Sequence, residues 1–268
     1  MRFCNEIGRG IVAKLKYIPN IRYMEVVNME YEIIGDNLQM VVTKLSSGEM
    51  VYGEAGAMIY MSENMQMNAK AKGGFLKGLK RKFAGETFFM TEFTPNGDGF
   101  VAFAGNAPGR IKAIELKGNE FLAQKDAFLC AQDGVDLDIA FTKKLGAGLF
   151  GGEGFILEKL SGNGTVFIHA CGDFVEMDLA QGEVVKVDTG SVVGFDNTVG
   201  YDITMAGNVK SMLFGGEGIF LTTLRGPGHV ILQSMTVANL AAALRPFMPS
   251  GTSGKSSSPL SIGGLLGG

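Results

Sequence analysis

The sequence predicts an all-β fold of three tandem β-sandwich-like modules, with one short helix near the C-terminal end. Forty of the 268 residues are glycine, without a Gly-X-Y period, which indicates many tight turns. Apolar runs alternate with turn signals at a spacing of about 8–12 residues, as in sandwiches and barrels. The pentapeptide Phe-Gly-Gly-Glu-Gly occurs at 150–154 and again, unchanged, at 214–218, which indicates an internal repeat.

Composition narrows the classes of function. The chain is 46% hydrophobic and 19% charged, and it carries a net charge of −3. It therefore has no overall positive potential to attract nucleic acid, and we do not expect nucleic acid as a partner. The three cysteines, without a CxxC pair, indicate free thiols in a reducing compartment. No apolar run reaches the roughly 18 residues of a membrane span. We therefore expect a cytoplasmic protein.

The first third of the chain predicts short strands after an N-terminal extension at 1–24. Residues 7–18 have apolar positions near helical spacing but also two glycines, so a short helix and a strand pair both fit. A hairpin turn at 46–49 separates two strands, and Met65, Met67 and Ala69 alternate as in a half-buried strand.

The same rhythm continues to residue 233. We expect strands at 87–93, 100–104, 111–116, 121–123, 127–131, 135–141, 155–160, 166–170, 174–179, 184–187, 201–205, 219–224 and 230–233, with Gly-rich turns at 161–164 and 225–228. Thr236 can cap a helix over 237–244 that Pro246 ends. Residues 250–268 are rich in Gly and Ser and predict a disordered tail.

Two motifs, each in three copies, divide residues 25–249 into modules of about 65 residues with a pseudo-threefold repeat. Residues 149–170 align without a gap on 213–234, and 82–104 is a looser copy. The second motif occurs near 48–59, 126–129 and 182–193. We place the modules near 82–141, 149–205, and 213–234, the last completed by 38–69. That completion can occur within one chain or with a neighbouring copy, and either route covers sheet edges.

Several of these motifs also carry a resemblance. The three GGEG-type turns, the stretch 54–58, and Leu79-Lys80-Arg81 before Gly85-Glu86 are similar to the altered-inheritance-of-mitochondria family, over roughly 25–245. The resemblance implies three β-modules related to the fold of the tryptophan RNA-binding attenuation protein, of double-stranded β-helix type. It also implies ring-like assembly, with a homotrimer of nine modules as the expected form. It implies no RNA binding and supplies no catalytic residues.

The basic segment at 72–82 is the strongest candidate binding site. Five basic residues surround apolar ones in helical spacing, without an acid until Glu86. The candidate residues are Lys72, Phe75, Leu76, Lys77, Leu79, Lys80, Arg81 and Lys82. An amphipathic basic stretch suits an anionic membrane surface or an acidic protein. The alternative is a connecting loop whose phenylalanines fill the core while its lysines stay solvated.

The repeated turns contain a second set of candidates, which are Gly85, Glu86, Gly152, Glu153, Gly216 and Glu217. If the three glutamates met on a pseudo-threefold axis, their oxygens could bind a cation. The more frequent use of such positions is structural: glutamate accepts turn N–H groups and glycine supplies a positive φ. We therefore assign these residues to the turns and expect no metal or other cofactor.

No residue pattern predicts catalysis. His169 and His229 occupy different module positions, and Cys130 and Cys171 lie in apolar strands, so structural histidines and buried thiols are expected. GxSxG, HExxH and Walker-type motifs are absent from the sequence. The sequence thus favours a non-enzymatic oligomeric assembly or scaffold protein, peripheral to a membrane. The alternative is a ring that binds a ligand or nucleic acid.

Overall fold

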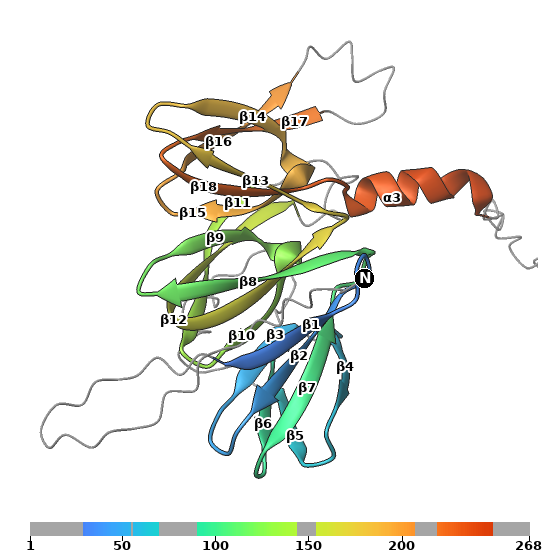
Figure 1. The fold of residues 1–268 in the computed structure, drawn as a ribbon. Coiled ribbons are helices and arrows are strands. Elements are labelled where there is room, and N and C mark those ends of the chain that lie inside the picture. Colours follow the sequence, from blue (N-terminus) through green and yellow to red (C-terminus); the bar gives the residue numbers. More distant parts are fainter. Residues whose placement is uncertain (1–28, 55, 70–89, 144–153, 207–218, 249–268) are drawn as a thin grey trace, which may run out of the picture.

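The computed structural model describes residues 29–54, 56–69, 90–143, 154–206 and 219–248, and these are mostly β-strands (Figure 1). The expected all-β fold with one short C-terminal helix is confirmed. The strands are β1 (Glu30–Ile34), β2 (Met40–Leu45), β3 (Val51–Glu54), β4 (Met58–Met61), β5 (Met65–Ala69), β6 (Met90–Pro95), β7 (Gly99–Ala104), β8 (Gly109–Lys117), β9 (Phe121–Gln124), β10 (Phe128–Gln132), β11 (Val135–Lys143), β12 (Phe155–Cys171), β13 (Phe174–Leu179), β14 (Val184–Asp188), β15 (Val192–Asp196), β16 (Gly200–Ala206), β17 (Ile219–Arg225) and β18 (Gly228–Gln233).

These strands form four sheets. Sheet A has the order β1-β2-β7-β4, and sheet D has the order β14-β17-β16. Sheet B runs β8-β12-β10-β3-β6-β5, and sheet C runs β13-β18-β15-β9-β12-β11. Sheets B and C share β12, so together they form one continuous sheet of 11 strands. All the pairings within these sheets are antiparallel.

Three hydrophobic cores lie between successive sheets. Phe103 of sheet A and Phe93 of sheet B belong to the first core. Phe128 of sheet B and Leu160 of sheet C belong to the second, and Phe195 of sheet C and Leu224 of sheet D to the third. These large side chains have at most 2% of their surface exposed, so their burial stabilises the stack A-B-C-D.

Strand β12 joins two of these layers because it is long and bent. Its first half pairs with β9 and β11 in sheet C, and its second half pairs with β8 and β10 in sheet B. The turn expected at 161–164 is therefore wrong, since the strand continues through these residues. Gly162 and Gly164, with φ of 100° and 149°, allow the chain to pass from one sheet to the next without reversing.

The turns of the second sequence motif are confirmed at two places. In the first, the Glu49 N–H donates to the Ser46 carbonyl, while the Glu49 carboxylate accepts the Ser46 N–H. Glu183 and Ala180 repeat both hydrogen bonds. The repeated Gly-Glu pair is thus a turn in which the glutamate side chain satisfies a backbone donor.

Within the described residues of one chain, 213–234 does not pair with 38–69, and completion of the third module by a neighbouring copy stays a prediction. Strands β2–β5 pair with β6 and β7, whereas β17 and β18 pair with β14, β16, β13 and β15. Both edges of β17 and of β18 are therefore occupied by strands that precede them in the chain. The other module boundaries stay predictions.

The C-terminal helix α3 (Val237–Leu244) is confirmed together with its cap. The Thr236 hydroxyl accepts the Asn239 N–H, and a short 3-10 turn at Arg245–Phe247 follows the helix. No residue of α3 is buried, and α3 projects sideways from the sheets (Figure 1). Within the described ranges no helix is long and apolar enough to cross a membrane. The expectations for 1–28 and 249–268 lie outside the described residues.

Candidate assembly site

The residues that the sequence singles out as candidates lie outside the described part of the chain. The basic segment 72–82, with Gly85 and Glu86, falls within 70–89. Gly152 and Glu153 fall within 144–153, and Gly216 and Glu217 within 207–218. The binding hypothesis for the basic segment and the turn hypothesis for the glutamates therefore stay predictions.

His229 lies in a polar cluster on the described surface. Its Nδ1 is 2.7 Å from the Asp178 carboxylate and its Nε2 is 2.9 Å from that of Glu176, which also pairs with Lys112 at 2.9 Å. Partial burial lowers the pKa of His229, but the two carboxylates outweigh it and raise the pKa overall. Each ring nitrogen is thus occupied by a carboxylate, an arrangement that joins β13, β18 and β8 rather than holding a ligand.

His169 is a buried structural side chain. Its imidazole lies against Gly105, where an added Cβ would be 2.4 Å from the ring. Burial lowers the pKa of His169, and a hydrogen bond with the Ala107 backbone opposes the shift in part. The ring is therefore fixed and neutral near pH 7. Cys130 and Cys171 are free and buried, and burial raises the pKa of both thiols, which keeps them unreactive.

Glu158 is the least expected buried side chain. It lies on β12 between β9 and β11, is 0% exposed, and neither carboxylate oxygen has a hydrogen-bond partner. Burial raises the pKa of Glu158 well above its usual range, and the charge of Glu54 adds to this shift. The carboxyl group is thus held in its neutral form. Glu158 is not among the residues that line the pocket between β11 and β16.

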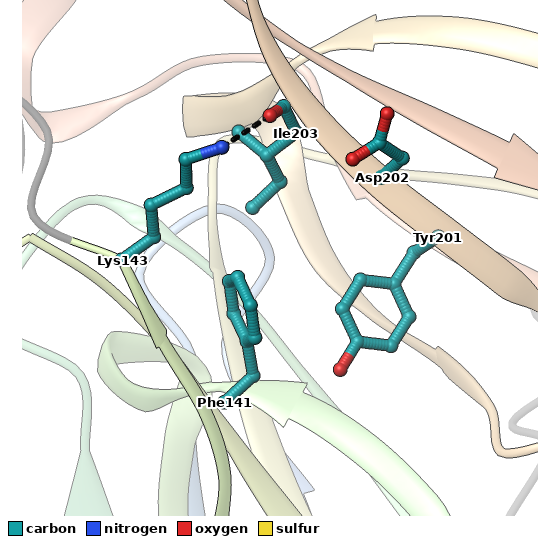
Figure 2. Close-up of a pocket in the computed structure, with 5 residues that line it drawn as sticks. All are labelled: Phe141, Lys143, Tyr201, Asp202 and Ile203. Atoms are coloured by element: carbon teal, nitrogen blue, oxygen red, sulfur yellow. Dashed lines mark hydrogen bonds between the residues drawn. The ribbon is translucent and has the colours of Figure 1, made fainter.

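A small pocket of about 330 Å³ opens between β11 and β16 (Figure 2). Phe141 and Tyr201 line it and meet edge to face at 5.6 Å, and the Lys143 ammonium donates to the Ile203 carbonyl. Its one acidic side chain is Asp202. A single lysine engaged by the backbone and a single carboxylate do not form an acid–base pair or a metal site. Across the described ranges, no group of three or more His, Cys, Asp or Glu could hold a metal ion.

The open edges of sheets A and D are the more distinctive feature. Strand β4 forms the edge of sheet A opposite β1, and strand β14 forms the edge of sheet D opposite β16. Neither the outer edge of β4 nor that of β14 meets another described strand. Ile59 and Tyr60 on β4 are 51% and 41% exposed, and Val184 on β14 is 50% exposed. Unpaired strand edges with exposed apolar side chains are typical of sites where another strand binds.

Known proteins with the same sequence pattern place the chain in a family. The sequence model of the family described as Mitochondrial biogenesis AIM24 matches residues 31–235. The chain belongs to this family. An uncharacterized protein of Streptococcus pyogenes serotype M6 is 31% identical over 218 residues, which cover 78% of this chain and 87% of the relative. A crystal structure of a Streptococcus pyogenes protein is similar with a TM-score of 0.67 and 27% identity, covering 82% of this chain and 100% of that one.

The part that matches the AIM24 family includes both open edges. Residues 31–235 extend from β1 to just after β18, so they contain sheets A to D, while α3 follows them. The repeated positions Met58–Ile59, Phe128–Leu129 and Val192–Val193 are apolar in all three copies, although no described strand covers the outer edge of β4.

Proposed function

We propose that the protein is a non-enzymatic structural protein that assembles with itself into a homo-oligomer, with a trimer as the expected form. This proposal rests on the unpaired strand edges at the two ends of the A-B-C-D stack, where β4 and β14 expose apolar side chains. One end presents β4 and the other presents β14, so two different surfaces are exposed. Surfaces that differ in this way suit head-to-tail association, which closes into a ring when the rotation allows.

The chemistry of the described side chains supports a structural role. The two histidines, the two thiols and the buried Glu158 are each held by packing or by partners that leave no reactive pair. The pocket between β11 and β16 has one lysine and one carboxylate. We therefore propose assembly rather than catalysis, in the cytoplasm, with the basic segment 72–82 as a contact for an anionic membrane surface.

The proposal is tested by the mass of the purified protein in solution. Multi-angle light scattering after gel filtration should give three times the 28.5 kDa of one chain at micromolar concentration. The mass should fall toward that of one chain on dilution. A single-chain mass at every concentration up to about 100 µM would overturn the proposal, because the open edges would then remain uncovered.

A further inference from the structure

Sheets B and C are each made of two three-stranded halves that join in the same way. Sheet B joins β8-β12-β10 to β3-β6-β5 through the pair β10–β3. Sheet C joins β13-β18-β15 to β9-β12-β11 through the pair β15–β9. Sheet A contains β2-β7-β4, a half of the first kind, and sheet D is β14-β17-β16, a half of the second kind. The end sheets therefore correspond to the two halves of such a sheet, with β1 added beside β2 in sheet A.

The strands at the joins can be matched by a shared irregularity. Strand β10 has a bulge between Phe128 and Cys130, and β15 has one between Val192 and Gly194. Strand β4 has the same bulge between Met58 and Tyr60. Tyr60 of β4 therefore corresponds to Cys130 of β10 and Gly194 of β15.

The opposite strands can be matched by the segment that follows them. Gln124 at the end of β9 and Asp188 at the end of β14 each cap a 3-10 turn with the side chain, and each accepts the N–H two residues on. In sheet B the Ala57 N–H donates to the Glu54 carbonyl at the same place. Val187 of β14 therefore corresponds to Ala123 of β9 and Gly53 of β3.

The two observed joins have one register. Cys130 lies opposite Gly53 in sheet B, and Gly194 lies opposite Ala123 in sheet C. Carried to the end sheets, this register places Tyr60 opposite Val187 and, one step along, Met61 opposite Lys186. The corresponding pairs one step along in the observed joins are Ala131 with Tyr52 and Phe195 with Leu122.

Backbone hydrogen bonds support this register independently. The Ser62 N–H donates to the Phe100 carbonyl of β7, so the N–H and C=O of Met61, one residue away, point to the open edge of β4. The Gly226 N–H donates to the Glu183 carbonyl, so residues 183, 185 and 187 face β17 and Lys186 faces the open edge of β14. Met61 and Lys186 therefore both have free backbone groups in positions to pair with each other.

The observed joins share this polarity. The Asp133 N–H donates to the Met50 carbonyl, two residues from the pair of Ala131 and Tyr52. The Asn197 N–H donates to the Glu120 carbonyl in sheet C at the equivalent place. Both joins thus have their hydrogen-bonded pair where the register puts Met61 and Lys186.

Burial shows what is missing at the ends. Leu129 on β10 enters the core between sheets A and B, and Val193 on β15 enters the core between sheets B and C. They are 3% and 1% exposed, whereas Ile59 at the same place on β4 is 51% exposed. By the same pattern, Ile59 is positioned to enter a core between sheets C and D, which in this chain lies at the other end of the stack (Figure 1). Only a second copy can bring that core to β4.

We infer that β4 of one chain pairs antiparallel with β14 of a second copy, with Met61 opposite Lys186 and Tyr60 opposite Val187. This inference rests on the proposed self-assembly and specifies its interface. The pairing makes a third continuous sheet of seven strands, β1-β2-β7-β4-β14-β17-β16, that spans two chains. It joins unlike surfaces, so each chain donates one edge and accepts another, and the ring closes when the last β14 meets the first β4.

The interface predicts a disulfide at one position. Tyr60 and Val187 form a non-hydrogen-bonded pair, in which Cα atoms are about 4.5 Å apart, within the range a disulfide spans. Tyr60→Cys and Val187→Cys are made on separate chains that carry different tags, with Cys4 replaced by Ser in both. On mixing and mild oxidation we expect a disulfide-linked pair containing both tags, and none from either chain alone. A chain with both substitutions should become covalently linked over most of its population.

A matched control uses the other edges of the same sheets. Glu32→Cys on β1 and Thr204→Cys on β16 are exposed but lie on the far edges of sheets A and D, so they should remain unlinked. The interface would be overturned if the yield of the 60–187 disulfide were no higher than that of the control, in a protein that light scattering shows to be oligomeric. Self-assembly would then still stand. A single-chain mass for the wild type would overturn both.

A second variant tests the backbone pairing itself. Lys186→Pro removes an N–H that points to the open edge and leaves the bonds to β17 intact, whereas Lys186→Ala keeps this N–H. We expect Lys186→Pro to raise the oligomer dissociation constant at least about tenfold with an unchanged circular dichroism spectrum, and Lys186→Ala to assemble like the wild type. Equal assembly of the two variants would overturn the pairing.

Discussion

Ile59 and Leu129 occupy the same place in two strands, yet one is 51% exposed and the other 3%. Each follows the first residue of its strand at a bulge, against β7 for Ile59 and against β12 for Leu129. The difference comes from the neighbouring module, which covers β10 through β3 but leaves β4 open. The single chain thus leaves about half of an aliphatic side chain exposed at this place.

This relationship predicts unequal costs of truncation. Leu129→Ala should lower the free energy of unfolding by about 2–4 kcal/mol, because it leaves a cavity in the first core. Ile59→Ala should cost less than about 1 kcal/mol at submicromolar protein, and more as the concentration rises and the oligomer forms. Urea unfolding at two protein concentrations measures both effects. A cost for Ile59→Ala that stays the same at both concentrations would contradict the proposed burial in a second copy.

Glu158 should make the stability of the protein depend on pH. Burial raises its pKa in the folded state, so the folded chain retains a proton that the unfolded chain loses above about pH 4.3. The contribution of neutral Glu158 to the free energy of unfolding is fully present below that pH, and it is lost as pH rises through the pKa of Glu158 in the folded state. Within this window the loss is up to about 1.4 kcal/mol per pH unit.

Glu158→Gln removes the ionisation and should therefore remove that pH dependence. Melting temperatures of the two proteins, measured from pH 4 to pH 9, should diverge in favour of the variant as pH rises. Glu183→Gln, on an exposed turn, is the control for the substitution itself. Parallel curves for wild type and Glu158→Gln would show that Glu158 does not titrate in this way.

His229 predicts a smaller effect with a defined pH window. Its pKa is raised in the folded state, since its hydrogen bonds to Asp178 and Glu176 outweigh the effect of burial. The resulting contribution of His229 to the free energy of unfolding is fully present below about pH 6.5, and it is lost as pH rises through the pKa of His229 in the folded state. Because the imidazole is 32% exposed, screening by solvent limits it to about 0.5–1 kcal/mol.

His229→Gln tests this contribution. Relative to the variant, the wild type should be more stable at pH 6 than at pH 9 by that amount, as followed by chemical unfolding at both values. The advantage should also shrink in 1 M salt, because the groups are partly solvated. A wild-type advantage that grows toward pH 9 would have the wrong sign for a histidine stabilised in its charged form.

Local signals in the sequence predicted local structure well. The Thr236 cap and Pro246 define α3, and the Gly-Glu turns at 48–49 and 182–183 are formed by side-chain contacts within four residues. Strand pairing depends on contacts distant in sequence, which these signals do not contain. Glycine cannot by itself distinguish a reversal from a bend, and 161–164 was therefore assigned to a turn although β12 continues through it.

The open edges of β4 and β14 could not be identified from local sequence signals either, because they too depend on strand pairing. The repeat identified equivalent positions, but only the pairings β10–β3 and β15–β9 show which edge of each module is covered. The cluster around His229 was equally hidden, because Glu176 and Asp178 lie on one strand and His229 on another. Burial of Glu158 was hidden as well, since its strand neighbours Lys159 and Leu157 suggest ordinary alternation.

Gly109 predicts a severe effect of a single added methyl group. A Cβ there would lie 1.7 Å from the Ala170 carbonyl oxygen, a backbone atom that cannot move without shifting β12. Gly109→Ala should therefore lower the free energy of unfolding by about 2 kcal/mol or more. Gly200→Ala is the control, because the nearest atom to its added Cβ is 3.7 Å away. Equal melting temperatures for the two variants would show that β8 and β12 can separate at little cost.

The basic segment 72–82 predicts binding to anionic membranes. Five basic residues within eleven positions of an acidic chain lie among Phe75, Leu76 and Leu79, a combination suited to a negatively charged surface. A trimer would present the segment three times, and three weak contacts on one assembly strengthen binding by orders of magnitude. The protein should co-sediment with phosphatidylserine-containing vesicles at low salt and dissociate as salt screens the charges.

The quadruple variant Lys77→Gln, Lys80→Gln, Arg81→Gln and Lys82→Gln isolates the charge of this segment. It should lose vesicle binding while keeping the melting temperature and oligomer mass of the wild type, because glutamine preserves much of the side-chain length without the attraction to lipid phosphate. Lys186→Pro adds a second comparison: if avidity matters, this variant should bind vesicles more weakly although its basic segment is intact. Equal retention of wild type and quadruple variant on the vesicles, or no binding by either, would leave 72–82 as a structural connector.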